Sequence, residues 1–284
     1  MSEQTSVIHD IGYQRYSGPR LGRGYAVRSL YEHSLRTAFG VGRGMKSKIF
    51  PWGVVGVASL ITVIIAAVSS TAGQRVISYV NLVDQMSVLI IIFLAVAAPE
   101  LISRDLRAKV LPLYFARPVG RFDYVGAKFA ALVASTWMAV GLPLVIVFAA
   151  VAFDADTVGD AWKEFTLLLG GLAYVLVLVL INAAVAMLVA ACTGRRAFAA
   201  GGIVGVYLVT LPVSVVLSEI GTGAAQNLSG LPSPTMTGAG LRYWVTGDGP
   251  IDIGGFGWLY LLVSLVLVAG SIAVTHARYR RVDS

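Results

Sequence analysis

The run Tyr174-Val-Leu-Val-Leu-Val-Leu-Ile181 is apolar at every position and lies inside a longer apolar stretch, 165–192. Only helices and closed barrels satisfy their backbone hydrogen bonds in hydrocarbon. A barrel strand alternates apolar and polar residues, which this run does not do. A helix needs about 20 apolar residues to cross roughly 30 Å of hydrocarbon. The sequence therefore predicts a membrane-spanning helix here.

The pattern recurs along the chain, which is 57% hydrophobic and only 13% charged. The predicted fold class is all-α: a polytopic six-helix transmembrane domain over 51–276, between a cytoplasmic segment 1–50 and a cytoplasmic tail 277–284. The other five predicted spans are 52–70, 85–102, 129–153, 197–217 and 256–275.

The basic residues indicate which way the chain sits in the membrane. Of 22 Lys and Arg residues, 19 precede the first span, follow the sixth, or lie in the second-to-third and fourth-to-fifth connections. Arg75, Lys163 and Arg242 fall on the other side. Because basic loops stay cytoplasmic, we expect a multi-pass protein of the inner (cytoplasmic) cell membrane with both termini cytoplasmic. The net charge of +7 then reflects topology and contact with the lipid bilayer, so no nucleic-acid partner is expected.

Two cytoplasmic segments carry apolar residues that need covering. Over about 25–40, Val27, Leu30, Tyr31, Leu35, Ala38 and Phe39 fall on one half of a helical wheel, which predicts an amphipathic interfacial helix. It serves either as a passive anchor or as a lever against a cytoplasmic partner.

The connection between the second and third spans is the more informative of the two. Its charged residues Arg104, Asp105 and Arg107 precede an apolar patch, and Pro112 and Pro118 favour a short helix there. We expect this patch on the aqueous side, as a contact surface for a partner. Glu100 and Arg104 are four residues apart and predict an ion pair at the inner membrane edge. The patch consists of Val110, Leu111, Leu113, Tyr114 and Phe115, and is followed by Arg117, Pro118 and Arg121.

The fifth-to-sixth connection, 218–255, is rich in Gly and Pro yet has few charges and an aromatic pair, Tyr243-Trp244. Such a sequence favours half-helices that dip back into the membrane over a disordered loop. Within the fifth span, Gly201 and Gly205 form a small-xxx-small pattern that predicts dimer contact or helix packing.

No catalytic constellation or metal site is apparent. The segment 40–47 fails the spacing of a nucleotide-binding loop, and the three histidines (His9, His33 and His276) are scattered. Charged residues are absent from the predicted span centres, whereas ion-coupled carriers usually have them there. We therefore expect no enzyme activity and no bound cofactor, and a source of driving energy outside this chain.

Together these features resemble the permease subunits of type-2 ABC exporters. The local match runs over 102–128: an acidic and a basic group leave the second span, a short helix and a Pro-Val-x-Arg turn follow, and a lysine opens the third span. Asp105, Arg107, Pro118, Val119, Arg121 and Lys128 take these places. Ala108-Lys109 stands where the family often has a glycine before the short helix.

The resemblance implies a half-transporter that exports a hydrophobic or amphipathic substrate. A separate cytoplasmic ABC ATPase, which holds the ATP and magnesium, would bind the second-to-third connection. A second permease copy or a paralogue would complete the transporter as a homo- or heterodimer. The alternatives are a membrane scaffold or assembly factor that recruits a cytoplasmic protein without transport and, less favoured, a secondary carrier.

Overall fold

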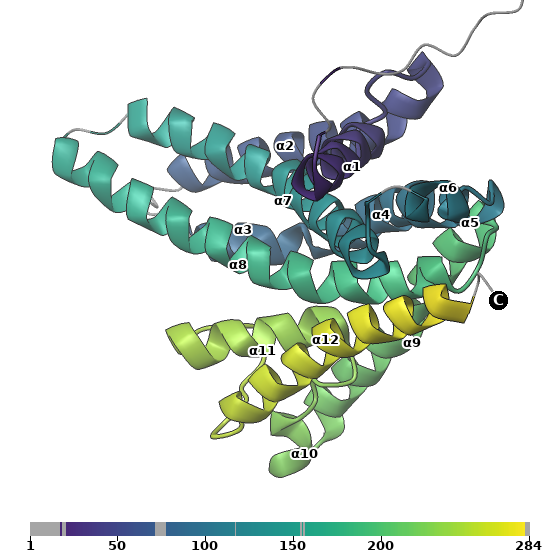
Figure 1. The fold of residues 1–284 in the computed structure, drawn as a ribbon. Coiled ribbons are helices and arrows are strands. Elements are labelled where there is room, and N and C mark those ends of the chain that lie inside the picture. The colour runs from purple at the N-terminus through teal and green to yellow at the C-terminus, as the bar shows by residue number, and fades with distance from the viewer. Residues whose placement is uncertain are drawn as a thin grey trace, which may run out of the picture.

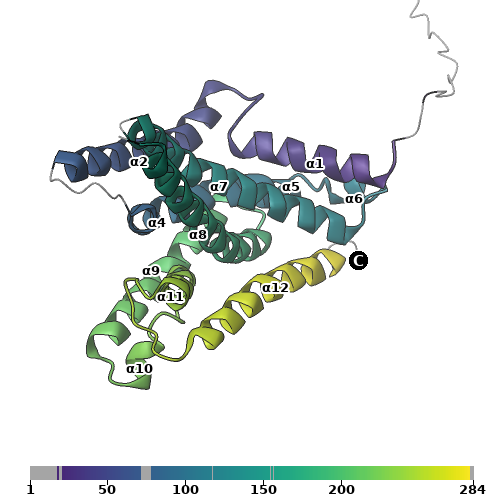
Figure 2. The ribbon, with the colours of Figure 1, turned by 90° about the vertical axis from the view of Figure 1, so that its left-hand side faces the viewer.

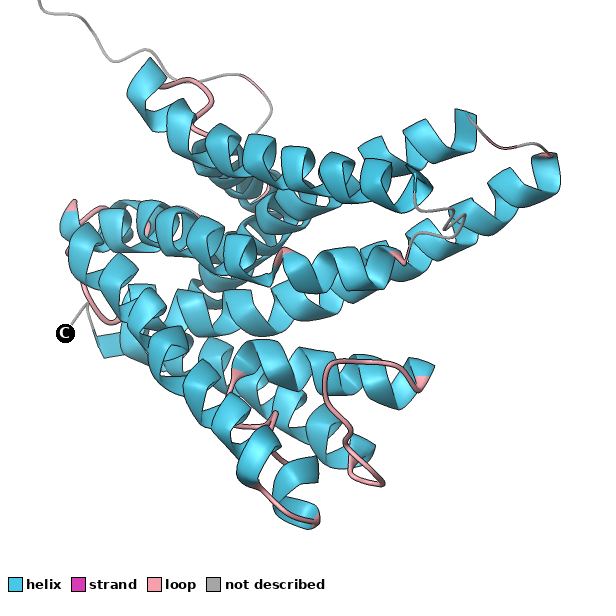
Figure 3. Cartoon of the chain, turned by 180° about the vertical axis from the view of Figure 1, so that it is seen from behind, coloured by secondary structure: helices cyan, strands magenta, loops and turns pink. Residues whose placement is uncertain are grey.

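The computed structural model describes residues 18, 21–71, 78–116, 118–153, 155 and 157–281. For residues 69–71 and 281 it describes the backbone only. All regular structure in these residues is helical (Figures 1 and 3). The elements are α1 (Arg23–Ala38), α2 (Met45–Thr71), α3 (Tyr79–Gln85), α4 (Ser87–Ala98), the π-helical turn η1 (Pro99–Ser103), α5 (Arg104–Arg107), α6 (Leu111–Phe115), α7 (Arg121–Phe153), α8 (Val158–Ala191), α9 (Arg196–Ile220), α10 (Ala224–Asn227), α11 (Pro234–Thr246) and α12 (Gly257–Arg281).

Six helices in the described part are long and apolar enough to cross a membrane, as the sequence predicts. The chain is thus an all-helical, multi-pass membrane protein. The helices run past the predicted spans, because hydropathy marks only the hydrocarbon-embedded part. The second span, for example, continues through η1 and α5 as far as Arg107. Large apolar side chains such as Leu60, Leu208 and Leu265 point outward, as lipid contact requires.

Helix α8 is the centre of the bundle and contacts α3, α4, α7, α9, α11 and α12. Its C-terminal half is lined with fully buried alanines, including Ala183, Ala186 and Ala190, and small residues let neighbouring backbones approach closely. Trp137 of α7 donates its indole N–H to the backbone oxygen of Leu172 at 3.0 Å, which fixes the antiparallel α7–α8 pair.

The second span contains a local irregularity with an identifiable cause. Pro99 has no N–H to donate, so the α-helical ladder is interrupted and the chain makes the π turn η1 before resuming as α5. Ser103, at the end of this turn, donates its hydroxyl to the backbone oxygen of Ala190 at 2.8 Å. The end of the second span is therefore attached to the end of α8.

The apolar face predicted for the N-terminal helix is real, but it is covered by protein. Leu30 and Ala38 are buried, and Val27, Tyr31 and Leu35 pack against the core. Helix α1 lies along α7 (Figure 2). Much of this apolar face is therefore occupied by contacts inside the chain, and Arg23 adds an ion pair to Asp123 of α7.

Candidate functional site

The residues singled out by the sequence gather at one end of the bundle, where η1, α5, α6 and the first turns of α7 and α9 meet (Figure 1). We call it the basic end, because most of the Lys and Arg residues between spans lie in its connections. Helix α12 also ends here, close to the start of α7 (Figure 2).

Glu100 is the centre of a charge network at the basic end. The predicted pair with Arg104 is confirmed, with the Arg104 Nη1 atom 3.3 Å from the carboxylate. Arg43 also donates to this carboxylate, and Arg196 lies 3.2 Å from its second oxygen. One carboxylate therefore joins the turn before α2, the second span and the start of α9. Such charge-assisted bonds are stronger than neutral ones.

A second carboxylate, Asp105, connects the second span to the third. The Lys128 ammonium lies 2.8 Å from Asp105, and the Tyr124 hydroxyl donates to the same carboxylate at 2.8 Å. The Lys128 side chain is only 5% exposed. A buried ammonium is tolerated only when paired, so this contact rigidly fixes α5 against α7.

Aromatic rings fasten α6 to the same place. The Tyr124 ring lies 5.5 Å from Tyr114, 6.1 Å from Phe115 and 5.7 Å from Tyr279 of α12, measured between centroids. Arg121 lies over the Phe115 ring at 5.6 Å. Helix α6 is therefore held on α7 by tilted and edge-to-face ring contacts.

The expectation that the whole apolar patch faces water is wrong for Leu111, which is only 1% exposed and belongs to the core. Val110, Tyr114 and Phe115 are half-buried. Leu113 is the member that projects, with 69% of its surface exposed. Pro112 and Pro118 are exposed, and Arg117 lies outside the described residues. The surface that a partner can reach is therefore narrower than the sequence suggests.

The turn between α5 and α6 has an unusual backbone. Lys109 adopts a left-handed conformation with φ of 52°. The N–H of Val110 bonds the oxygen of Asp105 at 3.3 Å, and that of Lys109 bonds Leu106 at 3.3 Å. This is a Schellman helix end, which glycine usually occupies. Lys109 thus adopts a backbone conformation that favours glycine. Glycine is also the residue that the resembled family often has just before the short helix.

An open cleft of about 370 Å³ lies beside α6. Helix α1 contributes His33 and Thr37 to its wall, and α6 contributes Leu113. Glu100, Asp105 and Lys128 also line it. Both charge networks and the exposed Leu113 side chain therefore border the same cleft.

The sequence predicts dimer contact or helix packing at Gly201 and Gly205, and the structure of the single chain bears only on the second. A side-chain carbon at Gly201 or Gly205 would meet nothing within 4 Å, whereas one at Gly202 would lie 3.0 Å from Val189 of α8. The close helix contact inside the chain is therefore made at Gly202. Gly201 and Gly205 face away from the described residues.

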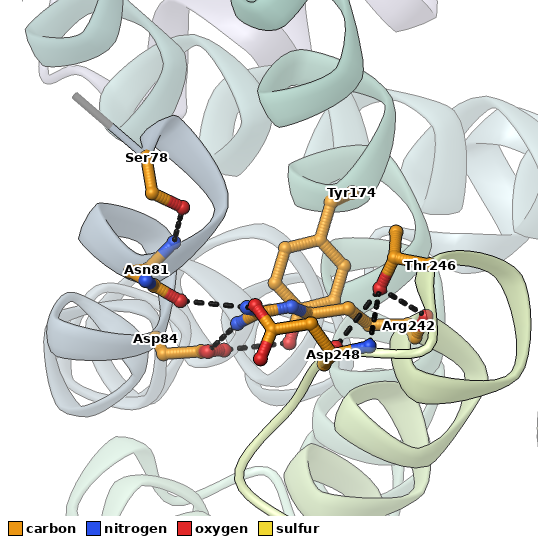
Figure 4. Close-up of polar contacts among 7 residues, drawn as sticks. All are labelled: Ser78, Asn81, Asp84, Tyr174, Arg242, Thr246 and Asp248. Carbon is orange, nitrogen blue, oxygen red and sulfur yellow. Dashed lines mark hydrogen bonds and ion pairs between the residues drawn. The ribbon is translucent and has the colours of Figure 1, made fainter. Parts of the chain in front are cut away.

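A polar cluster that the sequence did not reveal joins α3, α8 and α11, away from the basic end (Figure 4). Arg242 of α11 has a side chain only 3% exposed. It donates to Asp84 of α3, to Asn81 at 2.6 Å and to Asp248 at 2.9 Å. The Tyr174 hydroxyl of α8 donates to Asp84 at 2.6 Å. Burial raises the pKa of the Asp84 carboxyl, while the bonds from Tyr174 and Arg242 oppose that shift.

The segment 218–255 is folded rather than loose. Helix α11 packs between α8, α9 and α12, and its second residue, Thr235, donates to Asn182 at 3.0 Å. Tyr207 of α9 donates to the same Asn182 oxygen at 2.8 Å. Asn182 lies nine residues before the end of α8, or about 14 Å at the α-helical rise. The N-terminus of α11 thus lies beside a candidate span, about 14 Å before the end of α8.

The roles of Arg43, Arg196 and Tyr124 at the basic end could not be predicted from the sequence. The partners of the arginines are distant in the chain: Arg43 and Glu100 are 57 residues apart, and in the second cluster Arg242 and Asp84 are 158 apart. The one available signal was an isolated basic residue, Arg242, in an otherwise weakly charged loop.

Comparison with known proteins gives no further assignment: no protein-family model matches the chain, and no curated protein is similar to it in sequence.

Proposed function

We propose that this chain is the transmembrane permease half of an ATP-driven ABC-type exporter of the type-2 architecture. It moves a hydrophobic or amphipathic substrate out of the cytoplasm, and a separate cytoplasmic subunit hydrolyses the ATP. The chain contributes no nucleotide site to this reaction. Its role is to convert movement of the ATPase into rearrangement of its helices.

The observation that carries the proposal is the construction of α6. This five-residue helix exposes Leu113 while Tyr114 and Phe115 hold it on Tyr124 of α7. Asp105, just before it, is tied to Lys128 of α7. A partner that pushes on Leu113 therefore displaces the ends of the second and third spans together. A loop that only connects two helices has no need for such fastening.

Two further features support the proposal. The cleft beside Leu113 brings charged groups of both signs within reach of a docked partner, so that apolar and charged contacts combine at one site. On α9, Gly201 and Gly205 leave a small-residue face without a partner in the described chain. A second permease copy or a paralogue would approach closely there.

The experiment is purification of the tagged full-length chain from its native membrane, followed by a nucleotide-hydrolysis assay. We expect a co-purifying subunit with a phosphate-binding loop and ATP hydrolysis that magnesium removal abolishes. A chain that purifies with a cytoplasmic partner lacking any nucleotide site would favour the scaffold function instead. A chain that transports without such a subunit would favour a secondary carrier.

The proposed direction of coupling requires the basic end to face the cytoplasm. We expect an alkaline phosphatase reporter fused after Ser284 to be inactive, because this enzyme matures only outside the cytoplasm. The same reporter fused after Gly255, ahead of α12, is expected to be active. The reverse pair of results would place α6 outside the cell and contradict the proposal.

A further inference from the structure

A second cleft at the basic end has no role in the proposed coupling. It is open, has a volume of about 820 Å³ and lies between α5 and the start of α9. Arg107, Arg195 and Arg196 contribute its charge, and Ala197 and Phe198 contribute an apolar wall. None of the described residues that line it is acidic. Its chemistry is therefore that of a site for an anion with an apolar portion.

Within the described part of the chain, two of the three arginines have no carboxylate to neutralise them. Arg196 is paired with Glu100 at 3.2 Å. For Arg107 and Arg195, the described residues provide no ion-pair partner. They belong to different elements, yet the backbones of Arg107 and Gly194 lie close enough that a side-chain carbon on Gly194 would be 3.5 Å from the Arg107 nitrogen. Two like charges are thus brought to the same cleft.

The apolar wall faces outward, toward lipid. Phe198 is 65% exposed, and the Arg195 guanidinium lies 5.6 Å from its ring centroid. Phe198 is the third residue of α9, and further along the same span Leu208 and Val209 are strongly exposed. An aromatic ring and arginines at the end of a span occupy the level of the lipid headgroups.

We propose that this cleft binds one anionic phospholipid of the adjoining leaflet. Arg107 and Arg195 pair with its headgroup phosphate, and Phe198 packs against the first part of its acyl chain. Guanidinium forks bind phosphate in a bidentate way, and basic pockets between spans suit anionic headgroups. The bound lipid joins the end of the second span to the start of the fifth. This inference does not depend on the transport function.

The test measures lipid binding to the purified full-length chain in neutral detergent, by native mass spectrometry and thermal unfolding. The probes are phosphatidylglycerol, phosphatidylcholine and inorganic phosphate. We expect phosphatidylglycerol to bind and to raise the unfolding temperature, and the other two to have little effect. In Arg107→Gln/Arg195→Gln, the apparent Kd for phosphatidylglycerol should rise at least about tenfold, since loss of even one such contact corresponds to roughly that factor.

The matched control is Lys46→Gln/Arg280→Gln, which removes two exposed cations outside the cleft. Its net charge is therefore the same as that of Arg107→Gln/Arg195→Gln. It should bind phosphatidylglycerol like the wild type. Equal weakening of phosphatidylglycerol binding in both double variants would mean that the overall charge of the chain causes the effect. That result would overturn the proposed site. Equal binding of phosphatidylcholine, or displacement by inorganic phosphate, would overturn the choice of an anionic lipid. If the double variant does not fold, phosphatidylglycerol binding is compared between Arg195→Gln and the wild-type chain. Weaker binding by Arg195→Gln, together with the wild-type preference for phosphatidylglycerol over phosphatidylcholine, would then support the site.

Discussion

Arg242→Leu is expected to lower the free energy of unfolding by about 3–5 kcal/mol, the usual cost of leaving one member of a buried ion pair alone. Asp84 would keep its bond from Tyr174 but lose the guanidinium that compensates its charge. The measurement is denaturant unfolding of the full-length chain in detergent, followed by tryptophan fluorescence.

The control for Arg242→Leu is Arg28→Leu, whose partner Glu32 is one turn away and whose side chain is 79% exposed. An exposed helical pair of this kind contributes only about 0.3–0.5 kcal/mol. Arg242→Leu/Asp84→Leu should recover part of the loss, because it removes the buried unpaired charge. Equal effects of Arg242→Leu and Arg28→Leu would mean that the cluster contributes no more than a surface pair.

The same substitution has a local consequence. The Thr237 side chain is fully buried, and its hydroxyl donates to the backbone oxygen of Ser233 at 2.9 Å. A cysteine introduced there should react slowly with an impermeant thiol reagent and faster in the Arg242→Leu background, because α11 loses its attachment to α3. An unchanged labelling rate would show that other contacts suffice to hold α11.

Leu113→Asp is expected to weaken binding of the proposed ATPase at least about a hundredfold, because an unpaired carboxylate at a buried contact costs several kcal/mol. The permease should still accumulate, since Leu113 contributes little to its own core. Leu111→Asp should instead prevent accumulation, because that side chain is inside the fold. The measurement compares membrane-fraction yield with the amount of ATPase retained on the tagged chain.

A matched control places the same change on an exposed apolar residue at the other end of the bundle. Val158, the first residue of α8, is 88% exposed, so Val158→Asp should retain both yield and ATPase. A Leu113→Asp protein that keeps its ATPase would remove this face of α6 from the contact. A Leu113→Asp protein that fails to accumulate would assign Leu113 to folding instead.

The six helices could be predicted because each contains an apolar stretch long enough to cross the bilayer. No other stretch of the sequence has this length and composition. The ion pair Glu100–Arg104 could be predicted because four-residue spacing fixes proximity on a helix. Which residue of α6 points outward could not be predicted. A five-residue helix has little more than one turn, so Leu111 and Leu113 are equivalent in sequence although one is core and the other surface.

Other features depend on how the helices are placed against one another. Gly201, Gly202 and Gly205 lie within five consecutive residues of α9, and only the placement of α8 decides that Gly202 makes the contact inside the chain. The apolar face of α1 was recognisable, but its partner, α7, was not, because amphipathicity indicates that a face is covered without indicating by what. Arg242 and Asp84 meet only once α3, α8 and α11 are assembled.

In the proposed function, this chain transmits the action of a separate ATPase. The most direct measurement is the ATP hydrolysis rate of the purified ATPase alone and after assembly with the full-length chain in lipid nanodiscs, with the Leu113→Asp chain as a third sample. We expect the wild-type chain to change the rate several-fold and the Leu113→Asp chain to leave it at the level of the ATPase alone. The same rate in all three samples would contradict the proposed function.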